Sequence, residues 1–167
     1  YIAEHDDALA FAHINRQLIA LRIMQQVKAN GNSVLDVAHN FVSACRIGDQ
    51  QGWLHRKGAT PDDNGLVIIP GSRGDYSWLV QPVANEKTLR SLAHGAGRKW
   101  GRTECKGRLE AKYTATQLSR TELGSRVICR DKQLIFEEAP QAYKSAESVV
   151  QCLVQAGLII PVARLRP

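Results

Sequence analysis

The sequence predicts an α+β fold in which mixed or antiparallel β-sheets are flanked by helices. Three observations lead to this prediction: an opening stretch with helical apolar spacing, several short apolar runs separated by turn-forming residues, and a second half that mixes both patterns. The sequence contains no internal repeat and no low-complexity linker. Its 167 residues suit one domain with a substantial core, so we expect a single domain over residues 1–167.

The opening segment is predicted to be a helix from about Asp7 to Ala29, because apolar residues recur there at three- and four-residue intervals. Asp6 or Asp7 is expected to cap its start, and Asn30-Gly31-Asn32 is expected to end it.

Short apolar runs bounded by turn formers predict the strands of the first half. Turns are expected at Pro61-Asp62-Asp63-Asn64-Gly65 and at Pro70-Gly71-Ser72-Arg73-Gly74. The predicted strands are Val34–Val42, Gly52–Arg56, Leu66–Ile69 and Tyr76–Val80.

The second half alternates between the two patterns. A helix is predicted from Thr103 to about Gln117, followed by a polar stretch. Two short strands are then expected around a turn at Asp131, and a helix and a strand close the chain. These last elements are Val127–Cys129, Leu134–Phe136, the helix Ser145–Gln155 with Gly157 after it, and Leu158–Leu165.

The charge balance favours a polyanionic partner such as nucleic acid, because the net charge is +6 and the pI is near 9.4. A merely solubilising surface explains the same balance. The distribution of charge is more informative, since a basic block between Arg90 and Arg108 surrounds a glycine-rich segment and contains a single acidic residue, Glu104.

No run of about 18 apolar residues exists, and the acidic first residues do not resemble a secretory signal. The four cysteines are widely spaced, which is typical of reduced thiols. We therefore expect a cytoplasmic protein without a membrane partner. Because the chain lacks an initiator methionine, we also expect it to start inside a larger protein or to have been trimmed.

The segment His94-Gly95-Ala96-Gly97-Arg98 is the strongest candidate for chemistry. Small residues after a histidine let backbone N–H groups approach a phosphate, and the guanidinium of Arg98 can donate two parallel hydrogen bonds to it. A neutral imidazole nitrogen is also a competent nucleophile toward phosphorus. The alternative is a tight turn beside a structural histidine.

Three further motifs carry both a functional and a structural interpretation. Pro70 to Ser77 is a glycine-rich loop after an apolar run, as in phosphate cradles, or a plain hairpin turn. His39-Asn40 offers a metal ligand and a ligand contact, or a packed histidine. Arg56-Lys57-Gly58, with Arg98 and Arg102, suits an RNA backbone or a solvated charge run.

Taken in order, these four motifs resemble the C-terminal half of the RtcB family, the GTP-dependent RNA ligases. The family carries a His-Asn pair, then Arg-Lys-Gly-Ala, then Pro-Gly-Ser-x-Gly with a serine shortly after, then His-Gly-Ala-Gly-Arg. Tyr143-Lys144 resembles the family's later Tyr-Lys pair. The matching residues are His39-Asn40, Arg56-Lys57-Gly58-Ala59, Pro70-Gly71-Ser72-Arg73-Gly74 with Ser77, and His94-Gly95-Ala96-Gly97-Arg98.

The resemblance implies a layered α/β architecture of the RtcB kind and a defined reaction. His94 would form a covalent histidine–GMP with GTP and pass the guanylyl group to an RNA 3′-phosphate. A 5′-hydroxyl end would then displace GMP, and a 2′,3′-cyclic phosphate end would first be opened. The implied roles are RNA repair or tRNA splicing, and an activator protein is a further candidate partner.

The resemblance also assigns site residues. His39 would be one Mn²⁺ ligand, and Lys57, Arg98 and Arg102 would contact RNA or phosphate. The residues implied to bind GTP are Asn40, Pro70, Gly71, Ser72, Arg73, Ser77, Gly95, Ala96, Gly97 and Tyr143.

The chain departs from the family pattern at several places. Arg73 stands where methionine is usual, and the other metal ligands and a closing lysine are expected outside this sequence. We therefore expect a C-terminal portion of a divergent member, with little or no ligation by the chain alone. A non-catalytic RNA- or nucleotide-binding module derived from this fold is the competing hypothesis.

Overall fold

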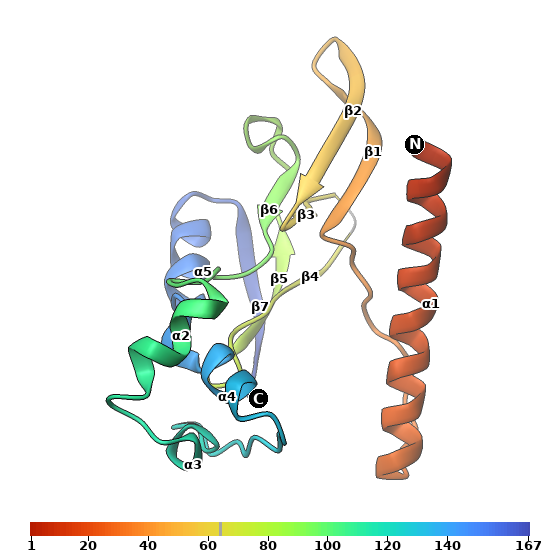
Figure 1. The fold of residues 1–167 in the computed structure, drawn as a ribbon. Coiled ribbons are helices and arrows are strands. Elements are labelled where there is room, and N and C mark those ends of the chain that lie inside the picture. Colours follow the sequence, from red (N-terminus) through yellow and green to blue (C-terminus); the bar gives the residue numbers. More distant parts are fainter. Residues whose placement is uncertain (64) are drawn as a thin grey trace. The chain divides into compact units, whose positions relative to one another are not determined.

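The computed structural model describes residues 1–63 and 65–167, so Asn64 of the predicted turn 61–65 lies outside the described residues. Helices and antiparallel sheets confirm the α+β class (Figure 1). The chain divides into two compact units, Tyr1–Thr60 and Pro61–Pro167. The expectation of a single domain stays a prediction.

The first unit opens with α1, Ile2–Val27, which confirms the predicted helix but starts earlier (Figure 1). Tyr1 occupies the N-cap position, so the predicted cap at Asp6 or Asp7 is wrong, and both residues lie inside the helix. The helix ends at Lys28, which adopts the left-handed conformation with φ of 52°. None of the α1 side chains is buried.

The segment that follows α1 corrects the predicted strand at Val34–Val42. Residues 30–39 form no strand, because Val34 is 87% exposed and side-chain bonds to α1 hold the segment instead. Asp36 accepts hydrogen bonds from Arg16 Nε and lies 2.7 Å from His13 Nδ1. The hydrogen bond from Arg16 outweighs burial and keeps the pKa of Asp36 below its usual value.

A β-hairpin completes the first unit. It joins β1, Asn40–Ile47, to β2, Gln50–Lys57, in antiparallel register from Asn40 opposite Lys57 to Ile47 opposite Gln50. The predicted strand Gly52–Arg56 lies inside β2 and is confirmed. The short strand β3, Ala59–Pro61, follows the hairpin.

The second unit is built on a three-stranded antiparallel sheet of order β4-β5-β7 (Figure 1). Val67, Ile69 and Val80 are fully buried along it. The predicted strands at 66–69, 76–80 and 158–165 are thereby confirmed. Their bounds are β4, Val67–Ile69; β5, Ser77–Pro82; and β7, Ile159–Leu165; the 3-10 helix Glu86–Thr88 and β6, Ser91–Ala93, lie between β5 and the helices.

The single helix predicted over residues 103–117 is wrong, because two helices occupy this stretch. They are α2, Arg102–Leu109, and α3, Ala115–Leu118. Thr114 restarts the helix: its Oγ1 accepts from the Gln117 N–H at 3.2 Å, and Gln117 Oε1 accepts from the Thr114 N–H at 2.7 Å. This capping box begins α3, after α2 has ended at its C-cap Glu110.

The predicted strand at Leu134–Phe136 is also wrong, because α4, Lys132–Glu137, contains it. Asp131 caps this helix by accepting from two backbone N–H groups, those of Gln133 and Leu134. Its buried face joins a second core cluster. The members of this cluster are Leu109, Leu118, Ile135, Phe136 and Ala139.

Residues 127–129 form no strand, since the Val127 N–H donates to the Ser119 carbonyl in a loop. The closing helix is confirmed as α5, Ala146–Gln155, with Ser145 at its N-cap. The 3-10 helix Pro140–Ala142 precedes it. Among the residues that the structure describes, no helix is long and apolar enough to cross a membrane.

Candidate functional site

The first glycine-rich segment is the loop from Pro70 to Tyr76 that joins β4 to β5. It closes on itself, because the Gly71 N–H donates to Ser77 Oγ at 3.2 Å. A Cβ at Gly71 would lie 2.3 Å from the Tyr76 carbonyl oxygen, a distance that no side chain tolerates. The fold therefore requires glycine here, and the nucleotide contacts of Ser77 and Gly71 stay a prediction.

Asp75 fixes this loop to the rest of the second unit. Its Oδ1 accepts from the Tyr76 N–H at 2.8 Å, and its Oδ2 accepts from the Ala146 N–H at 2.9 Å, at the first residue of α5. Gly74 packs equally closely, since a Cβ there would lie 2.4 Å from Pro140 Cγ. The role of Asp75 is not evident from the sequence, because nothing in the loop indicates which distant helix its carboxylate contacts.

The second glycine-rich segment follows β6 and contains half-buried His94. A Cβ on Gly95 would lie 3.3 Å from the Pro70 carbonyl oxygen, so the two glycine-rich segments are in contact at this point. Gly97 has φ of 72°, a conformation that favours glycine. The structure thus brings together two motifs that lie about twenty residues apart in the printed sequence.

Tyr143 lies beside the second segment, and its contact with the nucleotide stays a prediction. It forms an isolated antiparallel bridge with Arg98. On either side of it, the Lys144 N–H donates to the Gly97 carbonyl at 3.1 Å and the Lys99 N–H donates to the Ala142 carbonyl at 2.7 Å. The segment after His94 is therefore held by main-chain bonds.

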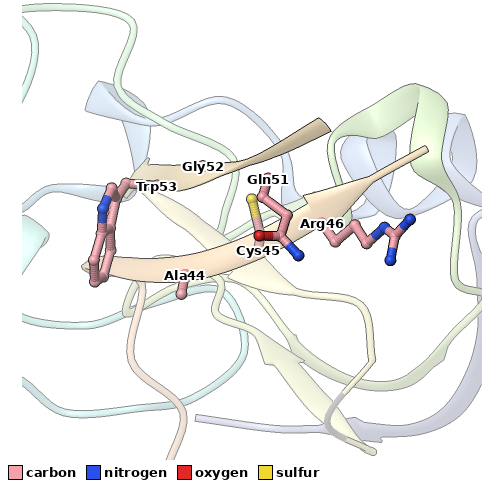
Figure 2. A pocket seen from close by; sticks show the side chains of 6 residues that line it. All are labelled: Ala44, Cys45, Arg46, Gln51, Gly52 and Trp53. Carbon is pink, nitrogen blue, oxygen red and sulfur yellow. The ribbon is translucent and has the colours of Figure 1, made fainter. Parts of the chain in front are cut away.

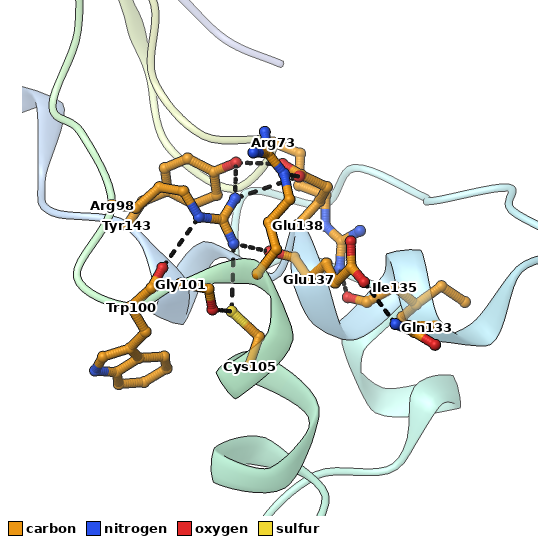
Figure 3. Close-up of polar contacts among 11 residues, drawn as sticks. Arg73, Arg98, Trp100, Gly101, Cys105, Gln133, Ile135, Glu137, Glu138 and Tyr143 are labelled. Carbon is orange, nitrogen blue, oxygen red and sulfur yellow. Dashed lines mark hydrogen bonds and ion pairs between the residues drawn. The ribbon is translucent and has the colours of Figure 1, made fainter.

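Arg98 makes five hydrogen bonds, one for each N–H group of its guanidinium (Figure 3). Its side chain is 19% exposed, and its Cζ lies 4.7 Å from the centroid of the Tyr143 ring. The acceptors are the Trp100 carbonyl (3.2 Å), Glu138 Oε1 (3.2 Å), Tyr143 Oη (2.7 Å), Cys105 Sγ (3.3 Å) and the Glu137 carbonyl.

Glu138 joins the side chains around Arg98. Its Oε1 accepts from both Arg98 and Arg102, at 3.2 and 3.4 Å, and its Oε2 accepts from the Tyr143 hydroxyl. Burial pushes the pKa of Glu138 upward, but the Tyr143 hydrogen bond and the charges of Arg98 and Arg102 outweigh it and leave the pKa lowered. Burial and the bond to Glu138 raise the pKa of Tyr143, which keeps its phenol protonated.

Arg73 points into the protein rather than along the glycine-rich loop. Its Nη2 donates to the Ile135 carbonyl at 2.7 Å (Figure 3). It also donates to the Leu118 carbonyl at 3.2 Å, so that Arg73 joins the loop to α3 and α4. Burial lowers the pKa of Arg73. A nucleotide contact by Arg73 stays a prediction, and its guanidinium already serves the fold.

The remaining predicted residues lie in the first unit, where two of the motifs meet. Asn40 Oδ1 accepts from the Gly58 N–H at 2.8 Å, and the His39 carbonyl accepts from the Ala59 N–H at 3.1 Å. Exposed Lys57 is paired with Asn40 in the hairpin register. The His-Asn pair and the Arg-Lys-Gly-Ala motif are therefore neighbours at one end of the hairpin.

The residues of this chain do not by themselves fit the implied manganese ion. No group of three or more His, Cys, Asp or Glu side chains gathers within residues 1–63 and 65–167. His39 alone supplies one nitrogen ligand, whereas a catalytic site needs several ligands in a defined geometry.

A hollow of about 600 Å³ lies on the hairpin and is lined by Ala44, Cys45, Arg46, Gln51, Gly52 and Trp53 (Figure 2). None of the predicted site residues lines it. A hollow of about 390 Å³ in the second unit includes Gly74 but not His94. Neither hollow is part of the candidate site.

Known proteins resemble the chain over its whole length. The family model described as tRNA-splicing ligase RtcB matches residues 1–167. RNA-splicing ligase RtcB2 of Escherichia coli is 95% identical over 167 residues, which cover all of this chain and 44% of that protein.

More distant relatives share the same region. The tRNA-splicing ligase RtcB of Archaeoglobus fulgidus is 34% identical over 196 residues, covering all of this chain and 40% of the relative. That of Methanocaldococcus jannaschii is 36% identical over 156 residues, covering 81% of this chain and 16% of the relative. The chain spans less than half the length of these relatives. It belongs to the tRNA-splicing ligase RtcB family.

Proposed function

We propose that this chain carries the nucleotide-binding and nucleophile-bearing part of a GTP-dependent RNA ligase, with His94 as the nucleophile. Its substrates are RNA ends bearing a 3′-phosphate or 2′,3′-cyclic phosphate and RNA ends bearing a 5′-hydroxyl. RNA repair and tRNA splicing both supply such ends.

The reaction proceeds in three transfers. An imidazole nitrogen of His94 attacks the α-phosphorus of GTP, so that a P–N bond forms, the bond to the β-phosphate breaks and pyrophosphate leaves. An RNA 3′-phosphate oxygen then takes the guanylyl group and restores the imidazole. The 5′-hydroxyl finally attacks the activated 3′-phosphorus, releases GMP and loses its proton to solvent. Water opens a cyclic phosphate before the second transfer.

The single observation that carries this proposal is the contact between the two glycine-rich segments beside His94. The backbone of Gly95 packs against the Pro70 carbonyl, so that two loops with small side chains border the proposed nucleophile. Loops of this kind let main-chain N–H groups approach phosphate oxygens closely. The names of the relatives, RNA-splicing and tRNA-splicing ligases, agree with this chemistry.

The proposal includes Mn²⁺, with His39 as the ligand that this chain contributes. Since one histidine does not form a site, none of the three transfers is assigned to the metal. Lys57 and Arg102 are both exposed. Lys57 supplies positive charge for the RNA backbone, and Arg102 supplies positive charge for the transferring phosphate.

An end-joining assay tests the proposal. The intact protein is given GTP, Mn²⁺ and two RNA fragments, one with a 3′-phosphate and one with a 5′-hydroxyl. Joined product that requires GTP and is lost in His94→Ala supports the ligase. Salt-dependent RNA binding without any joining supports the non-catalytic binding module instead, and the absence of both RNA and GTP binding rejects both hypotheses.

A further inference from the structure

The two arginines predicted to meet phosphate, Arg98 and Arg102, have very different surroundings. All five N–H groups of Arg98 have protein acceptors, so this side chain meets a phosphate only by giving up an existing bond. The side chain of Arg102 is 65% exposed, and its Nε donates to Glu138. Both terminal nitrogens of Arg102 make no hydrogen bond within the described part of the chain.

Glu138 is the group that these side chains share. One carboxylate oxygen accepts from both arginines, and the other accepts from the Tyr143 hydroxyl. The network contains two positive charges and one negative charge, because Tyr143 stays neutral. One positive charge is therefore left over, and it lies on the exposed guanidinium of Arg102.

The positions of Glu138 and Arg102 in their helices are both locally unfavourable. Arg102 is the first residue of α2, where the helix dipole repels a cation, and Glu138 is the C-cap of α4, where the dipole repels an anion. Residues that violate a local preference in this way are expected at functional or strained sites. Here the two residues pair with each other, since Arg102 Nε donates to Glu138 Oε1 at 3.4 Å, and this contact counters part of both costs.

We propose that Glu138 is a positioning residue of the His94 site, which aims Arg102 at the phosphates while it holds Arg98 and Tyr143 in the scaffold. This role rests on the proposed ligase function. Arg98 then acts as a structural cation, and Arg102 supplies the charge that meets the transferring phosphoryl group. Glu138 itself touches no reacting atom.

The rate of His94 guanylylation tests this role in the intact protein with GTP and Mn²⁺. Glu138→Gln keeps the size of the side chain and removes its charge. We expect it to lower the rate at saturating GTP by roughly tenfold or more, with the KM for GTP changed by less than about threefold. Glu138→Asp, which keeps the charge, should recover part of the rate.

Glu137→Gln is the matched control. It removes the same charge from the neighbouring residue, whose carboxylate accepts from Gln133 at 2.9 Å and from no other group in residues 1–63 and 65–167. The bond from Arg98 goes to its main-chain carbonyl, which the substitution preserves. This variant should keep a rate within about twofold of the wild type.

A double-mutant cycle separates positioning from general support of the fold. If Glu138 acts through Arg102, the variant with both Glu138→Gln and Arg102→Ala is no slower than Arg102→Ala alone. Multiplied losses in the double variant would overturn the proposal even if Glu138→Gln is less stable. So would a wild-type rate in Glu138→Gln. A wild-type protein that forms no adduct overturns the ligase function itself, and the role of Glu138 with it.

Discussion

Oε1 of Glu138 accepts a hydrogen bond from Nη1 of Arg98 at 3.2 Å, and this ion pair connects the end of α4 to the segment that follows His94. The pair is only partly accessible, since the Arg98 side chain is 19% exposed. A charge in such a place is stable only when it is paired and hydrogen-bonded. The rigidity of the His94 segment therefore depends on the partners of Arg98 as well as on glycine.

Removal of Arg98 should destabilise the protein. Arg98→Ala leaves Glu138 without one of its cations and takes five donors from their acceptors. We expect a loss of about 1–3 kcal/mol in the free energy of unfolding, since buried acceptors lose their donors. Urea unfolding measures this loss. Arg102→Ala is the control, because removal of this exposed side chain should lower the free energy of unfolding by less than about 1 kcal/mol. Equal losses in the two variants would contradict the structural role of Arg98.

The contribution of Glu138 to stability should depend on pH. Its pKa is lowered in the folded protein, since the Tyr143 bond and the two arginine charges outweigh burial. When the pKa of a group is lower in the folded state, the group contributes its full stabilisation of the fold at pH values above its unfolded-state pKa. This stabilisation is lost as the pH falls through the folded-state pKa.

The urea midpoint of the wild type should therefore exceed that of Glu138→Gln near about pH 6, and the difference should shrink toward about pH 3. Arg98 and Tyr143 keep their protons over this range, because the pKa of each is raised in the folded protein. A difference that grows as the pH falls would contradict the assignment.

The loop between β4 and β5 should reject any side chain at Gly71. Gly71→Ala places a Cβ 2.3 Å from the Tyr76 carbonyl oxygen, which is backbone and moves only with the loop. We expect a cost of about 1–3 kcal/mol in the free energy of unfolding. If the alanine variant unfolded at the same urea midpoint as the wild type, the close contact between Gly71 and the Tyr76 carbonyl oxygen would be contradicted.

Gly107 offers the opposite case in the same unit. It lies inside α2, and a Cβ there meets no heavy atom within 4 Å. Gly107→Ala should stabilise the protein by about 0.5–1 kcal/mol, because alanine loses less conformational entropy in a helix. A lower thermal midpoint in this variant would show that the helix face is not open.

Asp75 should stabilise both the loop and α5. Asp75→Ala removes the acceptor of the Ala146 N–H and of the Tyr76 N–H. We expect the free energy of unfolding to fall by about 0.5–2 kcal/mol. Hydrogen exchange at the Ala146 amide measures the local effect. Unchanged protection of that amide would exclude Asp75 as its acceptor.

The sequence predicted the strands of the second unit well, because β4, β5 and β7 are apolar runs between strong turn formers. It failed where a single polar residue decided the outcome. Asp131 caps a helix over residues that were predicted as a strand, and Thr114 restarts a helix that was predicted to be continuous. Both are capping residues whose effect depends on local geometry, so apolar periodicity alone does not reveal them.

The candidate site was predicted unevenly for a similar reason. The motifs around His94 and Pro70 are recognisable by composition, and the structure places them in contact. Glu138 was missed, because a Glu-Glu pair after an apolar run has the appearance of an exposed helix end. One signal was available: Arg98, if it is held inside the protein, needs an acidic partner, and Glu138 precedes Tyr143 by five residues.

Guanylylation of His94 can be measured by mass spectrometry of the intact protein after incubation with GTP and Mn²⁺. We expect a mass increase of one guanylyl group, located on His94 by peptide mapping and absent from His94→Ala. A wild-type protein that acquires no such group, or that carries it on another residue, would rule out His94 as the nucleophile.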